Sequence, residues 1–145
     1  MEKYFVTYAQ SIALKKLGFD MPCFAYIYIG DTGNNIDRYE EVEPSRAINF
    51  NHDSLCVSQP LKSQVFEWFD YKTFTDIEEK PFKLRGIITH KETGYFGCEI
   101  RTWRFDNNVG KWKREMILKS EQHRGVIESY AIDKLIETVK NNLYK

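Results

Sequence analysis

Cys56 and His52 lie four positions apart, so a thiol and an imidazole base could meet there. Cysteine catalysis needs a thiolate held beside such a base. Leu55 and Val57 flank the thiol, however, and a Leu-Cys-Val run is typical of a buried strand. We therefore interpret Cys56 as a core thiol and expect no nucleophilic catalysis.

The same residue types could also bind zinc. Structural zinc sites are anchored by closely spaced pairs of ligands, and no two cysteines or two histidines have such spacing. The six residues are Cys23, Cys56, Cys98, His52, His90 and His123. An odd number of cysteines in apolar surroundings is typical of reduced, buried thiols. The sequence predicts neither a metal or cofactor nor a disulfide framework.

Two further patterns resemble acid or cation sites. Residues 31 to 37 carry oxygen side chains at alternate positions, but Ile36 and Val42 stand where an EF-hand loop needs Gly and Glu. We expect a hairpin loop there instead. The pairs Glu40-Glu41 and Glu78-Glu79 adjoin predicted loops, where carboxylates are solvated and unsuited to general acid catalysis. With no glycine-rich phosphate loop either, we expect a protein that is not an enzyme.

The strongest functional signal is a period-two alternation after Pro81. Three antiparallel strands are expected at residues 82 to 89, 95 to 105 and 112 to 119. The expected core set is Phe82, Leu84, Ile88, Cys98, Ile100, Met116 and Leu118. Alternation then sends outward Lys83, Arg85, Glu99, Arg101, Trp103, Lys113, Glu115 and Lys119.

Aromatic residues interleaved with Arg and Lys hold single-stranded nucleic acid by stacking and phosphate attraction. The candidate nucleic-acid-binding residues are Lys83, Arg85, Arg101, Trp103 and Lys113. Alternatively, Glu99 and Glu115 pair across strands with these cations on a solvated face. The chain has 21 basic and 21 acidic residues, so it lacks the long-range attraction of a dedicated nucleic-acid or membrane binder.

Three amphipathic helices accompany these strands. Thr7 and Gln10 have capping-box spacing, which predicts a helix over residues 8 to 17 that ends at Gly18. Its expected stripe is Ala9, Ile12, Ala13 and Leu17. A second helix opens at Ser58-Gln59-Pro60 and presents Leu61, Val65, Trp68 and Phe69. The third starts with Ser129 as N-cap, since Gly125 argues against an earlier start, and presents Ile132, Leu135, Ile136, Val139 and Leu143.

The helices and strands together predict an α+β fold with the order α-β-β-α-β-β-β-α. Residues 23 to 29 and 37 to 42 supply the first two strands, while residues 43 to 57 fit no clear pattern. We expect an antiparallel sheet of about four to five strands with three helices packed on one face. The 145 residues are the size of one domain, so residues 1 to 145 are expected to form a single domain.

The longest apolar run, residues 23 to 29, is far shorter than the ~20 residues of a membrane-spanning helix. The first residues also lack the apolar core of a signal peptide. A cytoplasmic protein with no membrane association is predicted, and the oligomeric state stays open.

Three segments carry a family resemblance: Val6-Thr7-Tyr8 through Cys23, Pro60 through Phe69, and Ser129-Tyr130 through Ile136. They resemble a broad group of small proteins encoded by phages and prophages of gut bacteria. The resemblance implies a phage origin and a bacterial host cell. In order of elements, residues 60 to 143 are also similar to a double-stranded RNA-binding domain, but Ile127 to Ala131 replace that family's lysine cluster.

Our leading hypothesis is a small, non-enzymatic accessory protein of phage or mobile-element origin that acts through contacts with an unidentified protein partner. It is motivated by the absence of a reactive constellation and by 10 Phe, 9 Tyr and 3 Trp, more than one core needs. The alternative is a nucleic-acid-binding module that uses the outer face of residues 82 to 119.

Overall fold

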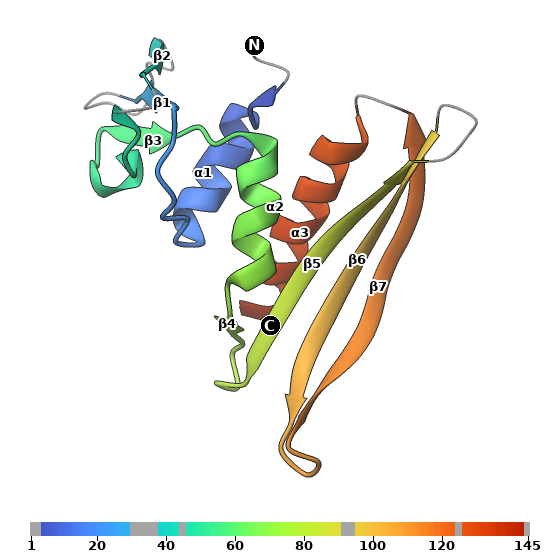
Figure 1. Cartoon of the computed structure of the whole chain (residues 1–145). Helices are drawn as coiled ribbons and strands as arrows, with labels where there is room; N and C mark the ends of the chain where they lie inside the picture. Colours follow the sequence, from blue (N-terminus) through green and yellow to red (C-terminus); the bar gives the residue numbers. More distant parts are fainter. Residues whose placement is uncertain (1–3, 30–37, 44–45, 91–94, 124–125, 144–145) are drawn as a thin grey trace. The chain divides into compact units, whose positions relative to one another are not determined.

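The computed structural model describes residues 4–29, 38–43, 46–90, 95–123 and 126–143 (Figure 1). It contains two compact units, Met1–Val65 and Phe66–Lys145. The predicted α+β class and the order of the main elements are confirmed. The strands form two sheets rather than the single one expected, one of three strands and one of four, because no described strand of the first pairs with a strand of the second. The expectation of a single domain stays a prediction.

The first helix, α1 (Tyr8–Lys16), begins and ends at the predicted caps. Thr7 accepts the Gln10 N–H at 3.2 Å, and the Gln10 side chain accepts the Thr7 N–H at 2.9 Å. At the other end, Gly18 has φ +88°, and the Phe19 N–H donates to the Leu14 carbonyl at 3.0 Å. This pattern is a Schellman motif, which satisfies carbonyls that the helix leaves open.

The predicted apolar stripe of α1 is confirmed only in part, because Ala13 is its one buried residue. Ala9 is exposed, whereas Leu14 and the polar residues Gln10 and Ser11 are buried. Gln10 can be buried because its amide oxygen is already bonded to the helix cap. The buried face is therefore rotated away from the one that hydropathy indicated.

The three-stranded sheet has β1 (Ala25–Tyr28) at its centre, paired antiparallel with β2 (Arg38–Glu41) and β3 (Cys56–Ser58). The first two strands match the predicted pair in shorter form. Residues 43 to 57, which fitted no pattern, contain a 3-10 turn, η3 (Phe50–His52), and then β3. Asn51 holds this segment in place, because its amide donates to the Phe19 carbonyl at 3.0 Å and accepts the Ser58 N–H at 2.8 Å.

The second helix, α2 (Lys62–Tyr71), begins later than predicted. Ser58 is a buried residue of β3 rather than part of the helix start. Nearer the helix, the Leu61 N–H donates to the side-chain oxygen of Gln64 at 3.0 Å. The predicted core residues Val65, Trp68 and Phe69 are fully buried, as expected. Trp68 packs edge-on against Phe69 and Phe74, with ring centroids 5.1 and 5.5 Å apart.

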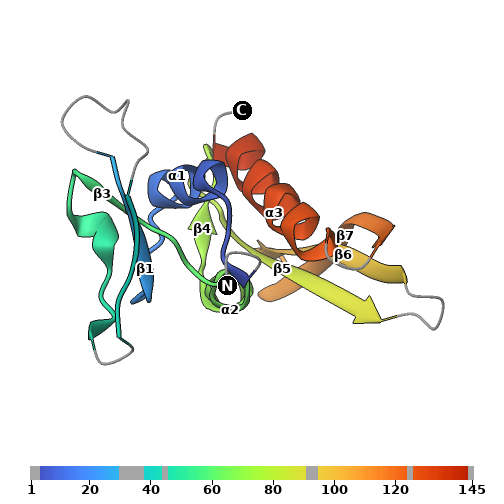
Figure 2. The same ribbon diagram turned by 90° about the horizontal axis from the view of Figure 1, so that it is seen from above.

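The four-stranded sheet is made of β4 (Phe74–Thr75), β5 (Pro81–His90), β6 (Tyr95–Asp106) and β7 (Lys111–His123), which confirms the three long strands. Figures 1 and 2 show α3 (Ile127–Leu143) along one face of this sheet, where it contacts β5, β6 and β7.

The helix α3 begins before Ser129, so the predicted N-cap is wrong. Ile127 is buried against the rest of the unit, and this packing extends the helix beyond its predicted start. The stripe Ile132, Leu135, Ile136 and Val139 is buried as predicted.

Arg104 of β6 links the sheet to the end of α3. Its guanidinium donates to the Asp76 carboxylate at 2.9 Å and to the Asn142 side chain. The backbone N–H of Lys80 and then the Arg104 guanidinium hold the pKa of Asp76 below its usual value. The face of the sheet that carries Arg104 therefore packs against α3. The opposite face is the one that is available to bind a ligand.

Candidate binding face of the four-stranded sheet

The two faces of the sheet differ as the alternation predicted. Phe82, Leu84, Cys98 and Ile100 are at most 1% exposed, which confirms four of the expected core residues. Ile88 is half-buried, and the side chains of Met116 and Leu118 lie outside the described ones. Lys83 is paired with Trp103, and Arg85 with Arg101, on the opposite face, which we call the outer face.

The register corrects the prediction for β7. Trp103 is opposite Arg114, whereas Lys113 is opposite Arg104 on the face that contacts α3. A bulge between Ile100 and Arg101 causes this difference, because it adds one residue to β7 and reverses its alternation on one side. Lys113 therefore leaves the outer face, and Arg114 takes its place.

The register also gives the partners of two other residues of β7 that were predicted to face outward. Glu115, between the bulge and the hairpin turn, is opposite Thr102, and Lys119, beyond the bulge, is opposite Glu99. The side chains of both residues lie outside the described ones. The register shift affects only the residues of β7 between the bulge and the hairpin turn.

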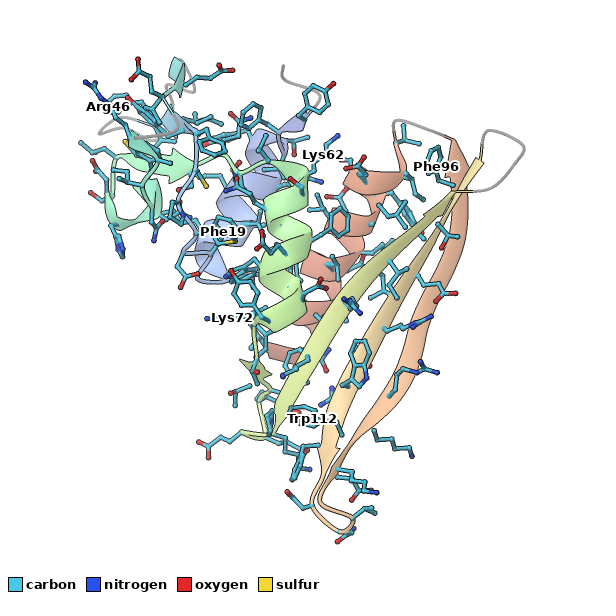
Figure 3. All side chains as sticks on the ribbon, viewed as in Figure 1. Phe19, Arg46, Lys62, Lys72, Phe96 and Trp112 are labelled. Atoms are coloured by element: carbon cyan, nitrogen blue, oxygen red, sulfur yellow. The ribbon has the colours of Figure 1, made fainter. Side chains whose placement is uncertain are left out.

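Among the described side chains, three aromatic residues gather on the outer face: Trp103, Phe105 and Trp112, here called the aromatic patch. Phe105 and Trp112 are cross-strand partners whose ring centroids lie 5.6 Å apart, edge to face. They remain 38% and 40% exposed, and Trp112 is seen near the hairpin between β6 and β7 (Figure 3). Sequence reasoning missed both, although their position on either side of a turn could have indicated a cross-strand pair.

An open pocket adjoins the aromatic patch. Its volume is about 390 Å³, and it is lined by Asp70, Lys83, Leu84, Arg85, Trp103 and Trp112. The Lys83 ammonium lies 5.1 Å from the centre of the Trp112 ring, a cation–π distance. Asp70 comes from α2 and was not indicated by any sequence pattern, because it reaches this pocket only through the tertiary fold.

The charges of the outer face are only partly compensated. Arg85 donates to Asp70 at 3.1 Å, and Arg101 pairs with Glu99 of its own strand at 2.8 Å, not across strands. Within the described part of the chain, no carboxylate lies within ion-pair distance of Lys83 or Arg114. The pocket and the aromatic patch thus have a basic border.

Two other sequence candidates, His52 and Cys56, belong to the first compact unit. His52 is exposed and lies 3.3 Å from the Asn49 amide, while Cys56 is buried within β3. No group of three or more metal-ligating side chains exists among the residues that the structure describes. The loop over residues 31 to 37 lies outside them. No helix in the described ranges has the length and apolar composition needed to span a bilayer.

All three cysteines are buried, which confirms the expectation of core thiols. Burial raises the pKa of Cys23 from 9.0 to about 12 and also raises that of Cys98. Near pH 8, Cys23 should carry on the order of a thousandfold less thiolate than a free thiol.

We therefore expect iodoacetamide to leave the folded protein unlabelled near pH 8, whereas all three thiols should react after denaturation. Mass spectrometry of the intact protein after a short exposure measures the number of adducts. Rapid labelling of one thiol in the folded protein would contradict the assignment of the cysteines as inert core residues.

Comparison of the chain with known protein families, with curated proteins and with solved structures finds no match. The comparisons therefore indicate no enzyme family. The resemblances to phage-encoded proteins and to a double-stranded RNA-binding domain stay predictions. The chemistry of the outer face carries the functional argument.

Proposed function

We propose that the protein is a non-enzymatic binding module whose outer sheet face binds single-stranded nucleic acid. One observation carries this proposal: the aromatic patch lies beside Lys83 and Arg114, two cations without a carboxylate partner among the described residues. Aromatic rings stack on exposed bases, and cations next to them attract the phosphates. The rings and the cations together therefore provide contacts for the base and for the phosphate of a nucleotide.

A single strand fits this face better than a duplex. Phe105 and Trp112 present partly exposed rings, and stacking on such rings requires bases that are not already stacked within a helix. The first turn of α3 carries Glu128 and no cation, so it lacks the phosphate-binding lysines of a double-stranded RNA-binding domain. Duplex binding is therefore not proposed.

A second candidate function is contact with a protein partner, in keeping with an accessory protein of phage origin. Val109 in the hairpin turn is 64% exposed and adds apolar surface near Phe105 and Trp112. Exposed aromatic residues frequently anchor protein interfaces. The two functions differ in salt dependence, because an apolar interface releases few counterions.

The charge-reversed double variant Lys83→Glu, Arg114→Glu tests the nucleic-acid function. We expect its affinity for a single-stranded oligothymidine to fall on the order of 100-fold at low salt, because two attractive contacts become repulsive. The slope of log affinity against log salt should also decrease by about 1.4, or about 0.7 for each lost contact. Fluorescence anisotropy of a labelled oligonucleotide measures both quantities.

A matched control is the double variant Lys134→Glu, Lys140→Glu, which makes the same charge change on α3. It should bind nearly as well as the natural sequence. Equal losses in both variants would show a non-specific charge effect and contradict a site on the outer face. Failure of the natural sequence to bind any single strand at low salt would eliminate the proposed function.

A further inference from the structure

We propose that the pocket beside the aromatic patch accepts a guanine base and that Asp70 recognises it. This inference rests on the proposed function and names the base that this site prefers. It starts from an anomaly of charge: a carboxylate lines a pocket whose other charged groups, Lys83 and Arg85, are cations. Asp70 would repel a phosphate, so its place in a nucleic-acid site needs another explanation.

The geometry leaves Asp70 able to accept further hydrogen bonds. The Arg85 Nε–H donates to Oδ1 of Asp70 at 3.1 Å, while the Asp70 side chain remains 37% exposed. An ionised carboxylate only accepts hydrogen bonds and has about four lone-pair positions. Because Arg85 occupies one of them, the remaining positions can receive N–H groups of a ligand in the pocket.

Among the bases, guanine suits such a carboxylate best. Its Watson–Crick edge presents two adjacent donors, N1–H and the 2-amino group, which can meet the two carboxylate oxygens together. Thymine offers one N–H, and adenine and cytosine offer one amino group beside an acceptor. Hydrogen bonds to an ionised acceptor are also stronger than neutral ones. The guanidinium of Arg85 lies beside Asp70 and could donate to guanine O6.

The rest of the pocket suits the other parts of the nucleotide. Trp103 and Trp112 supply aromatic surface for the flat base, and Lys83 supplies positive charge for a phosphate. The volume of about 390 Å³ suits a single nucleotide rather than a longer segment. A basic peptide would meet Lys83 and Arg85 as like charges, which disfavours a cationic protein segment as the occupant.

The test uses the full chain and thymidine oligonucleotides of about 12 nucleotides with one central base replaced. We expect a central guanine to bind roughly tenfold more tightly than thymine, as one two-donor contact would give. Inosine, which lacks the 2-amino group, should lose most of this preference. Fluorescence anisotropy at one fixed salt concentration gives the affinity for each strand. The result is the ranking of these affinities for strands with adenine, cytosine, guanine or thymine at the centre.

Asp70→Asn should remove the preference for guanine. Its affinity for the all-thymidine strand should stay equal or rise, because one negative charge is lost near the phosphates. Asp106→Asn makes the same charge change in the hairpin region outside the pocket, and it should keep the preference. Since the Asp70–Arg85 pair is exposed, the melting temperature of Asp70→Asn should be nearly unchanged.

Two outcomes separate this inference from the function on which it rests. If all the strands bind with equal affinity, the outer face binds nucleic acid but the guanine site is overturned. If none binds, the proposed function itself fails. If Asp70→Asn does not fold, the affinities of the natural protein for the guanine strand and the inosine strand still test the guanine site. Equal affinities for these two strands would contradict a contact that uses both donors of guanine.

Discussion

Trp68→Ala is expected to lower the free energy of unfolding by about 3–5 kcal/mol, a large fraction of the stability of an ordinary domain. Trp68 is fully buried and contacts Phe69 and Phe74 edge-on, and Phe74 in turn stacks on Phe82 of β5. Truncation would leave a cavity in the middle of this aromatic cluster. Urea or thermal denaturation followed by circular dichroism measures the loss.

Glu67→Ala is the matched control, because Glu67 is the preceding residue of α2 and is exposed. It should change stability by less than about 0.5 kcal/mol. If Trp68→Ala melted at the same denaturant concentration as Glu67→Ala, the aromatic cluster would not be the core of this unit. The direction of α2 against β4 and β5 would then need revision.

Gly86→Val should destabilise the protein by about 1–3 kcal/mol through overpacking. A Cβ atom at Gly86 would lie 2.9 Å from Phe66 Cε1 and 3.0 Å from Leu135 Cδ1, closer than carbon atoms normally approach. Both neighbours are ends of side chains, so they can shift slightly for Ala but less easily for the branched Val side chain. The missing side chain of Gly86 is thus what lets Phe66 and Leu135 approach β5.

Thr89→Val is the control for this substitution. It places the same side chain at an exposed position of the same strand, where valine suits the extended backbone. Its denaturation midpoint should stay close to that of the natural sequence. A Gly86→Val protein with unchanged stability would show that the close approach to Phe66 and Leu135 is not needed.

Features with a local physical cause were predictable from the sequence. The cap of α1 depends only on Thr7 and Gln10, three positions apart, and its end depends on the freedom of Gly18 to adopt a positive φ. Trp68 was predicted to be buried because helical spacing aligns it with other apolar residues. Lys83 and Trp103 were predicted to share a face because strand alternation has a period of two.

The remainder of the candidate site depended on contacts between distant segments. A single added residue in β7 reversed its alternation, so Arg114 and Trp112 replaced Lys113 on the outer face. Asp70 joined the pocket only because α2 packs beside β5, which no spacing in the sequence encodes. The sequence by itself therefore determined the main helices and strands, the caps of α1 and most of the buried stripes of α2 and α3. The tertiary structure decided the pairing register and the composition of the pocket, because both depend on how distant strands and helices meet.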